Sequence, residues 1–378
     1  MLKWTLSALL LFTQIQAQDT IWGNVDYIYW KIQNSPEDVP LVIQGPTLAV
    51  PPPVLGAPDT SVVLGGKKID TGWRSGVKAS LGLCFNSEYG IGTEINYFIL
   101  PGISKTHSVS SDGSPTSPLL LVPFFNVVTG MEDSTAISHP LLMFEGTATL
   151  KFANKMQGAE WNITTTLPSC YCGFKGFGFA GFRYWNFREH LTFTTSSPLL
   201  PPVTETYKTK DRFSVENNFF GGQLGLVWEC DYGCFSFNAR GTVALGAMCE
   251  RVVIKGNLLT NEYNGFGSVQ EFLGGYFALP TNIGKHSQTK FAAIPELNVA
   301  IGYQLFDGMR VKLGYTFMYV SNMLWAGKQI DRDINPTQAK TYTKAHTPML
   351  DGEASPKAHL KTASLWVQGL QAGIEFGF

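Results

Sequence analysis

Residues 235–247 have the sequence FSFNARGTVALGA, in which apolar side chains recur at every second position. Phe235, Phe237, Val243 and Leu245 carry this pattern, with polar or small residues between them. Successive side chains of a β-strand point to opposite faces of the sheet, so a period of two predicts a strand with one apolar face. The stretch therefore predicts an all-β fold.

The same alternation occurs along most of the chain and predicts about twelve strands. They span 21–32, 75–85, 89–100, 146–155, 158–167, 174–186, 189–195, 211–229, 234–253, 292–305, 309–322 and 363–378. Several are longer than the roughly five to six residues of an average strand, and they suit a tilted crossing of a membrane. We therefore expect a transmembrane strand architecture.

The connections between these strands alternate in length. Tight turns are expected at 86–88, near 155–157, and at 187–188, 231–233 and 306–308, whereas 33–74, 101–145, 196–210, 254–291 and 323–362 are long. Only the short link at 168–173 departs from this alternation. Tight turns on one rim and long connections on the other predict an antiparallel up-and-down β-barrel with short periplasmic turns, long extracellular loops and both termini periplasmic.

The first residues have the features of a secretory signal peptide. Lys3 forms a positive start, 6–12 is apolar, and Ala17 is a small residue at a cleavage point. We expect 1–17 to be a signal peptide and 18–378 a single barrel domain exported to the outer membrane of a diderm bacterium. No later apolar run is long enough for a membrane-spanning helix.

The composition agrees with a membrane barrel and excludes two other classes of protein. Charged residues make up 15% of the chain and aromatic residues 13%, with 39 Gly. A hydrophobic fraction of 44% excludes intrinsic disorder. A formal net charge of −1 argues against a nucleic-acid partner, because phosphate binding needs an excess of basic residues.

Motifs for catalysis or cofactor binding do not stand out. The glycines of 176–181 match a dinucleotide fingerprint, but they alternate with Phe and continue as a strand rather than opening a helix. The six His lack metal-ligand spacing, and nothing marks a nucleophile beside His190. We expect no enzymatic activity, no cofactor and no metal.

Inward-facing polar residues of the strands are the candidates for lining a pore. The basic ones are Lys78, Lys151, Arg183, Arg240, Arg310 and Lys312, and the acidic ones are Asp26, Glu94, Glu160, Glu296 and Glu375. This mixture predicts no charge selectivity and favours pairs across the lumen, because an unpaired charge in a narrow barrel is costly. The apolar segment 119–128 is expected either to fold inward as a constriction or to pack on the rim.

Six cysteines in an exported chain permit disulfides. Cys230 and Cys234 flank a turn and are candidates for a bond across the hairpin. Intermolecular cross-links, or cysteines that are simply small buried residues, are the alternatives.

Several stretches resemble one family of bacterial outer-membrane proteins, the beta-barrel porin-7 family. They are 217–226 (NNFFGGQLGL), 279–284, 294–305, 314–317, 327–331, 335–336, 27–31 and 366–378. The family name implies a channel, and the resemblance supplies no substrate or catalytic residue. The last strand also resembles substrates of the barrel assembly machinery, with Trp366, Ile374, Phe376 and the terminal Phe378 as the signal.

The sequence therefore predicts an outer-membrane porin for passive diffusion of small polar solutes. The alternative is a structural or adhesive envelope protein with an occluded lumen. The expected partners are outer-membrane lipid, the barrel assembly machinery and small polar solutes. Whether the chain forms a homo-oligomer is left open.

Overall fold

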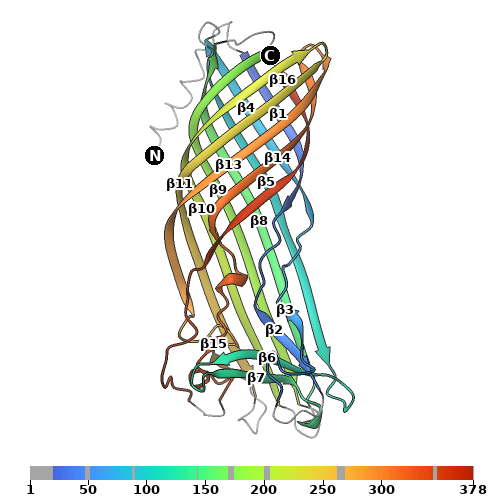
Figure 1. The fold of residues 1–378 in the computed structure, drawn as a ribbon, viewed down its shortest axis with the longest axis vertical. Coiled ribbons are helices and arrows are strands. Elements are labelled where there is room, and N and C mark those ends of the chain that lie inside the picture. The colour runs from blue at the N-terminus through green and yellow to red at the C-terminus, as the bar shows by residue number, and fades with distance from the viewer. Residues whose placement is uncertain are drawn as a thin grey trace.

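The computed structural model describes residues 20–46, 52–86, 90–142, 144–168, 174–199, 205–261, 269–343 and 347–377. Ten strands in these ranges form one closed antiparallel barrel (Figure 1). They are β1 (Thr20–Ile32), β4 (Trp73–Asn86), β5 (Ile91–Ser111), β8 (Gly146–Leu167), β9 (Phe174–Pro198), β10 (Thr206–Tyr232), β11 (Phe235–Thr260), β13 (Gly284–Phe306), β14 (Met309–Leu324) and β16 (Thr362–Gly377). The predicted all-β barrel is confirmed, with ten strands in place of about twelve.

The barrel is of the up-and-down type because each of its strands pairs with the next barrel strand along the chain. The first and last strands close it, since β1 pairs with β16 from Trp22 opposite Gly377 to Ile32 opposite Val367. Closure leaves the barrel without a free edge. One short strand, β12 (Gln270–Leu273), adds to the distal end of β11 outside the barrel.

Two of the turns predicted from the sequence, near 155–157 and at 187–188, are wrong. Both stretches lie inside continuous strands, where Lys155 is directly opposite Arg188 and Met156 opposite Phe187. The cause is an inversion of the hydrophobic pattern along each strand. In β8 the apolar side chains face outward at Trp161 and inward at Phe152, although the backbone keeps one phase throughout.

Because 146–167 and 174–198 are each one continuous strand, the short link at 168–173 no longer departs from the alternation of short and long connections. The links 87–90, 168–173, 233–234 and 307–308 now all join strand ends on the same rim, where β1 begins and β16 ends. The turn at 233–234 is of the two-residue type, with Tyr232 opposite Phe235 and Gly233 at a φ of +58°. Two-residue hairpins need a positive φ, which glycine adopts without strain. Of the connections at the other rim, all but 199–205 are long.

An apolar band surrounds the half of the barrel nearest the short turns. Large hydrophobic side chains such as Leu81, Ile95, Leu224, Phe291 and Leu313 are more than half exposed there. Such a band is the lipid-facing surface of a membrane barrel. No helix among the described residues is long and apolar enough to cross a membrane.

The other half of the structure is an open sheet filled by the long connections. Strands β5, β8, β9, β10, β11 and β13 continue beyond the shorter β1, β4, β14 and β16 (Figure 1). The described residues of 33–72, 112–145, 269–283 and 325–361 lie at this end and are called the distal lobe. Its sheet comprises β2 (Pro40–Gly45), β3 (Ser61–Gly65), β6 (Leu119–Asn126), β7 (Met131–Ser138) and β15 (Asp333–Ile334).

The apolar segment 119–128 supplies the central strand of this lobe. Most of it forms β6, which pairs with β2, β7 and β15. Leu120 and Val122 are buried in one cluster with Phe152, Phe193 and Phe213 of the long barrel strands. Of the two sequence alternatives, packing on the rim is therefore the one observed.

Candidate functional site: the barrel interior

Inward-facing charges form a layer within the membrane-embedded half of the barrel. This charged layer consists of Lys78 on β4, Glu94 on β5, Glu160 on β8, Arg183 on β9, Arg240 on β11 and Glu296 on β13. Each side chain points inward because its strand turns its apolar neighbours toward lipid. All six are among the residues predicted to face the lumen.

The ion pairs of the charged layer cross the lumen. Arg240 donates to both carboxylate oxygens of Glu94, although β11 and β5 are separated by three strands around the barrel. Arg183 pairs with Glu296 and lies 3.5 Å from the Glu160 carboxylate (Nη2 to Oε1). Lys78 Nζ is 3.9 Å from Glu296 Oε1. Arg240–Glu94, Arg183–Glu296 and Lys78–Glu296 join strands that are not neighbours, as the sequence predicted, whereas Glu160 is the cross-strand neighbour of Arg183.

Amide and aromatic side chains complete the layer. Asn162 Nδ2 donates to Glu94 Oε1 at 2.8 Å, and Gln223 Nε2 donates to Asn162 Oδ1 at 2.6 Å. The Arg240 guanidinium lies 4.0 Å from the centre of the Phe179 ring. Asp26, which is buried and is the cross-strand neighbour of Lys78, adds a fourth carboxylate beside the three cations and three carboxylates of the layer.

A second charged cluster lies at the end of the barrel near the short turns. Arg310 Nη1 is 2.6 Å from Glu229 Oε1 and 3.6 Å from Glu375 Oε1. Lys312 Nζ is 2.6 Å from Glu375 Oε2. The structure therefore brings together three further predicted candidates, Arg310, Lys312 and Glu375, but apart from the charged layer.

Beyond the charged layer, toward the distal lobe, the lumen is filled by apolar side chains. Trp185, Phe187 and Trp325 are fully buried at its centre, with ring centres 6.1 Å and 5.6 Å apart along this series. This apolar layer comprises Ile28, Trp30, Ile32, Phe98, Leu100, Met156, Trp185, Phe187, Phe219, Ala244, Met248, Ala292, Ile294, Met318, Val320, Met323, Trp325, Leu365 and Val367. They come from all sides of the barrel and pack as a protein core does.

A buried glutamate fastens two connections of the distal lobe beneath the apolar layer. Glu189 Oε1 accepts hydrogen bonds from the Ala326 backbone N–H at 2.9 Å and from Ser35 Oγ at 3.1 Å. Burial raises the pKa of Glu189 to about 8. Burial, and then the nearby charges of Glu189 and Asp38, raise the pKa of Glu37 well above its usual value.

Asp211 fastens another connection to the inner face of β10. Its carboxylate accepts the backbone N–H groups of Tyr276 (2.9 Å), Phe277 (3.0 Å) and Ala278 (2.7 Å). Burial raises the pKa of Asp211 to about 6, against the lowering by these three hydrogen bonds. The distal lobe is thus fixed to the barrel by buried polar contacts as well as by its apolar core.

One pore-lining candidate, Lys151, is placed on the wrong face by the sequence analysis. Lys151 is exposed on the outside of β8, between the buried Leu150 and Phe152. In this distal half, water lies outside the strand and the lobe core lies inside, so the apolar residues face inward. Glu189 and Asp211 were also missed, although each begins a predicted strand (189–195 and 211–229). Each lies on the side of its strand that carries buried apolar residues such as Leu191 and Phe213, and an apolar side reads from the sequence as lipid-facing.

The candidate disulfide between Cys230 and Cys234 is not formed. Both cysteines are free thiols. The hairpin turns at Gly233 and Cys234, so the residue opposite Cys230 is Phe237. Cys234 itself occupies the turn and has no cross-strand position facing Cys230.

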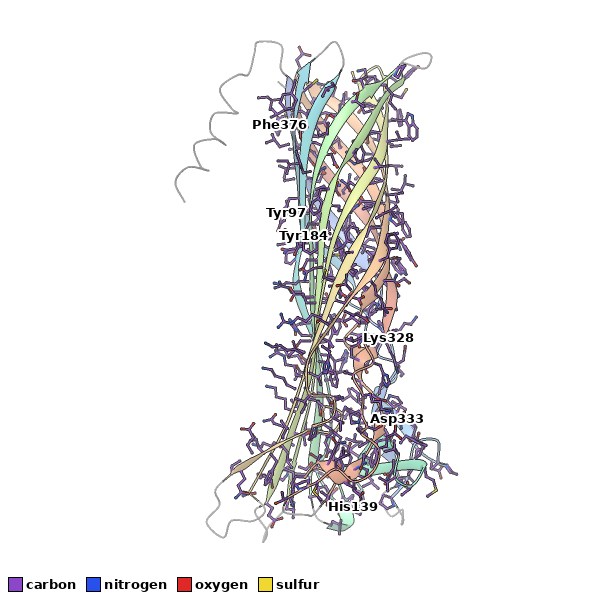
Figure 2. All side chains as sticks on the ribbon, turned by 90° about the vertical axis from the view of Figure 1, so that its left-hand side faces the viewer. Tyr97, His139, Tyr184, Lys328, Asp333 and Phe376 are labelled. Carbon is purple, nitrogen blue, oxygen red and sulfur yellow. The ribbon has the colours of Figure 1, made fainter. Side chains whose placement is uncertain are left out.

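The expected assembly signal lies mostly on the described part of β16. Ile374 and Phe376 are exposed on the lipid-facing side, and Trp366 is partly exposed on the same side of the strand (Figure 2 labels Phe376). Phe378 lies outside the described residues, as does the predicted signal peptide, 1–17.

The closed antiparallel barrel, its apolar outer band and its polar interior together define an outer-membrane β-barrel protein. Within this class, the chain belongs to the family described as "Putative beta barrel porin-7", whose sequence profile matches residues 22–378. The resemblance drawn from 217–226 and the other stretches is confirmed. No curated protein matches the chain.

Solved membrane barrels show distant likeness to the chain. The outer membrane protease OmpT from Escherichia coli is 10% identical, with 95% of this chain and 97% of that chain covered and a TM-score of 0.39. The Pseudomonas putida toluene transporter TodX is 8% identical (96% and 89% covered, TM-score 0.19), and the Ralstonia pickettii toluene transporter TbuX is 10% identical (95% and 88% covered, TM-score 0.17). With every TM-score below 0.5, these likenesses carry no conclusion about activity.

The described part of the chain contains no group of three or more His, Cys, Asp or Glu side chains arranged to hold a metal ion. The absence of enzymatic activity stays a prediction, favoured by membership of a porin family.

Proposed function

We propose that this chain is an outer-membrane barrel with an occluded lumen, acting as a structural or adhesive envelope protein through its distal lobe. The observation that carries this proposal is the apolar layer. Trp30, Trp185, Trp325, Phe187 and Phe219 all have no exposed surface. A polar solute would have to displace packed aromatic rings to pass them.

Passive diffusion of small polar solutes is the second candidate function. It is favoured by membership of the porin family and by the polar lining of the membrane-embedded half. For this function the apolar layer would have to move aside together with the distal lobe. The two candidates therefore differ in one measurable property, the conductance of the resting barrel.

Planar-bilayer recording of the full-length folded protein distinguishes them. We expect the wild-type protein to be silent, and the double variant Phe187→Ala/Trp325→Ala to show openings because it removes two rings from the apolar layer. The control is Leu224→Ala on the lipid-facing side, which should stay silent. Discrete, reproducible openings of the wild type would overturn the occluded barrel and support the diffusion channel.

The route to the membrane and the partners are part of this proposal. Removal of residues 1–17 at export would precede insertion, and the exposed Ile374 and Phe376 of the last strand would present the signal to the barrel assembly machinery. Outer-membrane lipid would contact the apolar band. The distal lobe would then face the cell exterior.

A further inference from the structure

A dense group of cations covers the outside of the long strands just beyond the apolar band. This basic face consists of Lys151, Lys155, Arg188, Lys208, Lys210, Arg212, Arg251, Lys255 and Lys285. Eight of these nine residues are exposed to solvent. Arg188 is partly buried, with 40% of its side chain exposed. In Figure 2, long side chains project from these strands at and below the height of Tyr184.

The register of the sheet places cations of the basic face directly opposite one another. Lys155 is the cross-strand partner of Arg188, and Arg212 is the partner of Lys255. Like charges directly opposite each other destabilise a sheet. The strands therefore carry repulsion that a bound anion would relieve.

Acidic side chains balance little of this charge. Among the described residues on the outward side of the distal halves of β8 to β11, one is acidic, Glu216. Its Oε1 lies 2.5 Å from Arg188 Nη2. Glu271 on β12 is hydrogen-bonded to Asn257 at the far end of β11. The neighbouring His190 has a lowered pKa, through burial first and then through the charges of Arg212, Arg188 and Lys155.

The basic face begins where the lipid-facing surface ends. Tyr184 and Phe220 are opposite each other at the edge of the apolar band, and Arg188 follows Tyr184 by four residues along β9. Four strand residues span about 13 Å, and the tilt of the strand makes the height smaller. That places the first cations at the level of lipid headgroups next to the distal lobe.

We propose that the basic face binds phosphate groups of outer-leaflet lipid headgroups, specifically those of a phosphorylated glycolipid whose acyl chains pack on the apolar band. Lys and Arg are the side chains that bind phosphate, and the convex outer wall suits molecules standing beside the barrel rather than a buried ligand. The inference uses the membrane location and the outward orientation of the distal lobe. It does not depend on whether the lumen conducts.

The test measures lipid retained by the folded, full-length protein in nonionic detergent, with native mass spectrometry as the readout. The probe is diphosphoryl lipid A, compared with the same lipid after removal of its phosphates. The variant neutralises four cations of the face: Lys155→Gln, Arg212→Gln, Arg251→Gln and Lys255→Gln. The control removes four exposed cations elsewhere: Lys67→Gln, Lys68→Gln, Lys175→Gln and Lys357→Gln.

Each basic residue near an anionic lipid surface contributes roughly fivefold in affinity, so four independent losses would multiply to roughly 600-fold. Neighbouring sites are not additive, and we expect the four-site variant to lose at least about tenfold. The control should bind as the wild type does, and lipid without phosphates should bind weakly to all three proteins. Equal loss in the control, or equal binding of dephosphorylated lipid, would overturn the proposal. Displacement by equimolar inorganic pyrophosphate would reassign the face to free phosphate compounds and also overturn it.

A stability measurement gives a second test, in which the shift of the thermal midpoint caused by one variant should change sign when lipid is added. In nonionic detergent alone, Lys255→Gln should raise the thermal midpoint, because it removes the repulsion with Arg212. With diphosphoryl lipid A present, the same variant should melt below the wild type. A shift of the same sign in both conditions would contradict a phosphate site at this pair.

Discussion

Removing Arg183 tests whether the charged layer is dry. Its side chain is 1% exposed and lies between Glu296 and Glu160, which are 8% and 11% exposed. Arg183→Met removes the cation that lies against both Glu296 and Glu160. Breaking a buried pair by removing one partner costs about 3–5 kcal/mol, because the remaining charge is buried without compensation.

The double variant Arg183→Met/Glu296→Gln removes both partners of the pair, so that neither charge of it is left buried without its partner. It should regain most of the lost free energy of unfolding, giving a coupling of about 2 kcal/mol or more. The assay is urea unfolding in lipid vesicles followed by tryptophan fluorescence, with the heat-induced mobility shift of the folded barrel as a check on insertion.

The matched control is Lys175→Gln at the rim. Lys175 is 59% exposed and lies 3.1 Å from Asp231, so its loss should cost at most about 1 kcal/mol. If Arg183→Met costs no more than this control, the lumen is hydrated around Arg183. The charged layer would then be open to water, and occlusion of the lumen would depend on the apolar layer alone.

Three further predictions concern the attachments of the lobe and the last strand. Since burial raises the pKa of Glu189 from 4.5 to about 8, the native state holds its proton more tightly than the unfolded chain, and the free energy of unfolding should fall as pH rises between these values. Urea midpoints at pH 5 and pH 8 should show that slope in the wild type and a weaker one in Glu189→Gln; an unchanged slope would place the titrating group elsewhere. Asp211→Ala should cost about 2–4 kcal/mol by leaving three buried N–H donors without an acceptor, and protease cleavage within 269–283 should increase, whereas equal cleavage rates would contradict the attachment. Deleting Phe378 should reduce membrane insertion, scored as loss of the heat-modifiable band; an unchanged band would argue against the assembly signal.

The sequence predicted the membrane-embedded half well because lipid outside and polar groups inside give every strand the same alternation. In β8, Trp161 and Ile163 face lipid, while Glu160 and Asn162 face the lumen. One strand is therefore enough to assign both faces. The inward charges of this half were found for that reason.

The distal half could not be predicted from the same rule. There the outside is water and the inside is a protein core, so apolar residues such as Leu191 and Phe193 of β9 move to the inward positions. An inverted pattern on an uninterrupted strand looks like a turn that resets the phase. The pairing of the lobe strands was also out of reach, because β6, β2 and β15 come from three different connections.

The distal lobe is assembled from segments near both ends of the chain. The segment after β1 and the segment after β14 meet at Glu189, and β15 joins β6 in the lobe sheet. The contacts at Glu189 bring together Ser35 and Ala326, about 290 residues apart, and the β15–β6 pairing joins residues about 210 apart, so we expect these contacts to form late. An antibody specific for the assembled lobe would therefore recognise chains in which the segments after β1 and after β14 have come together on β9.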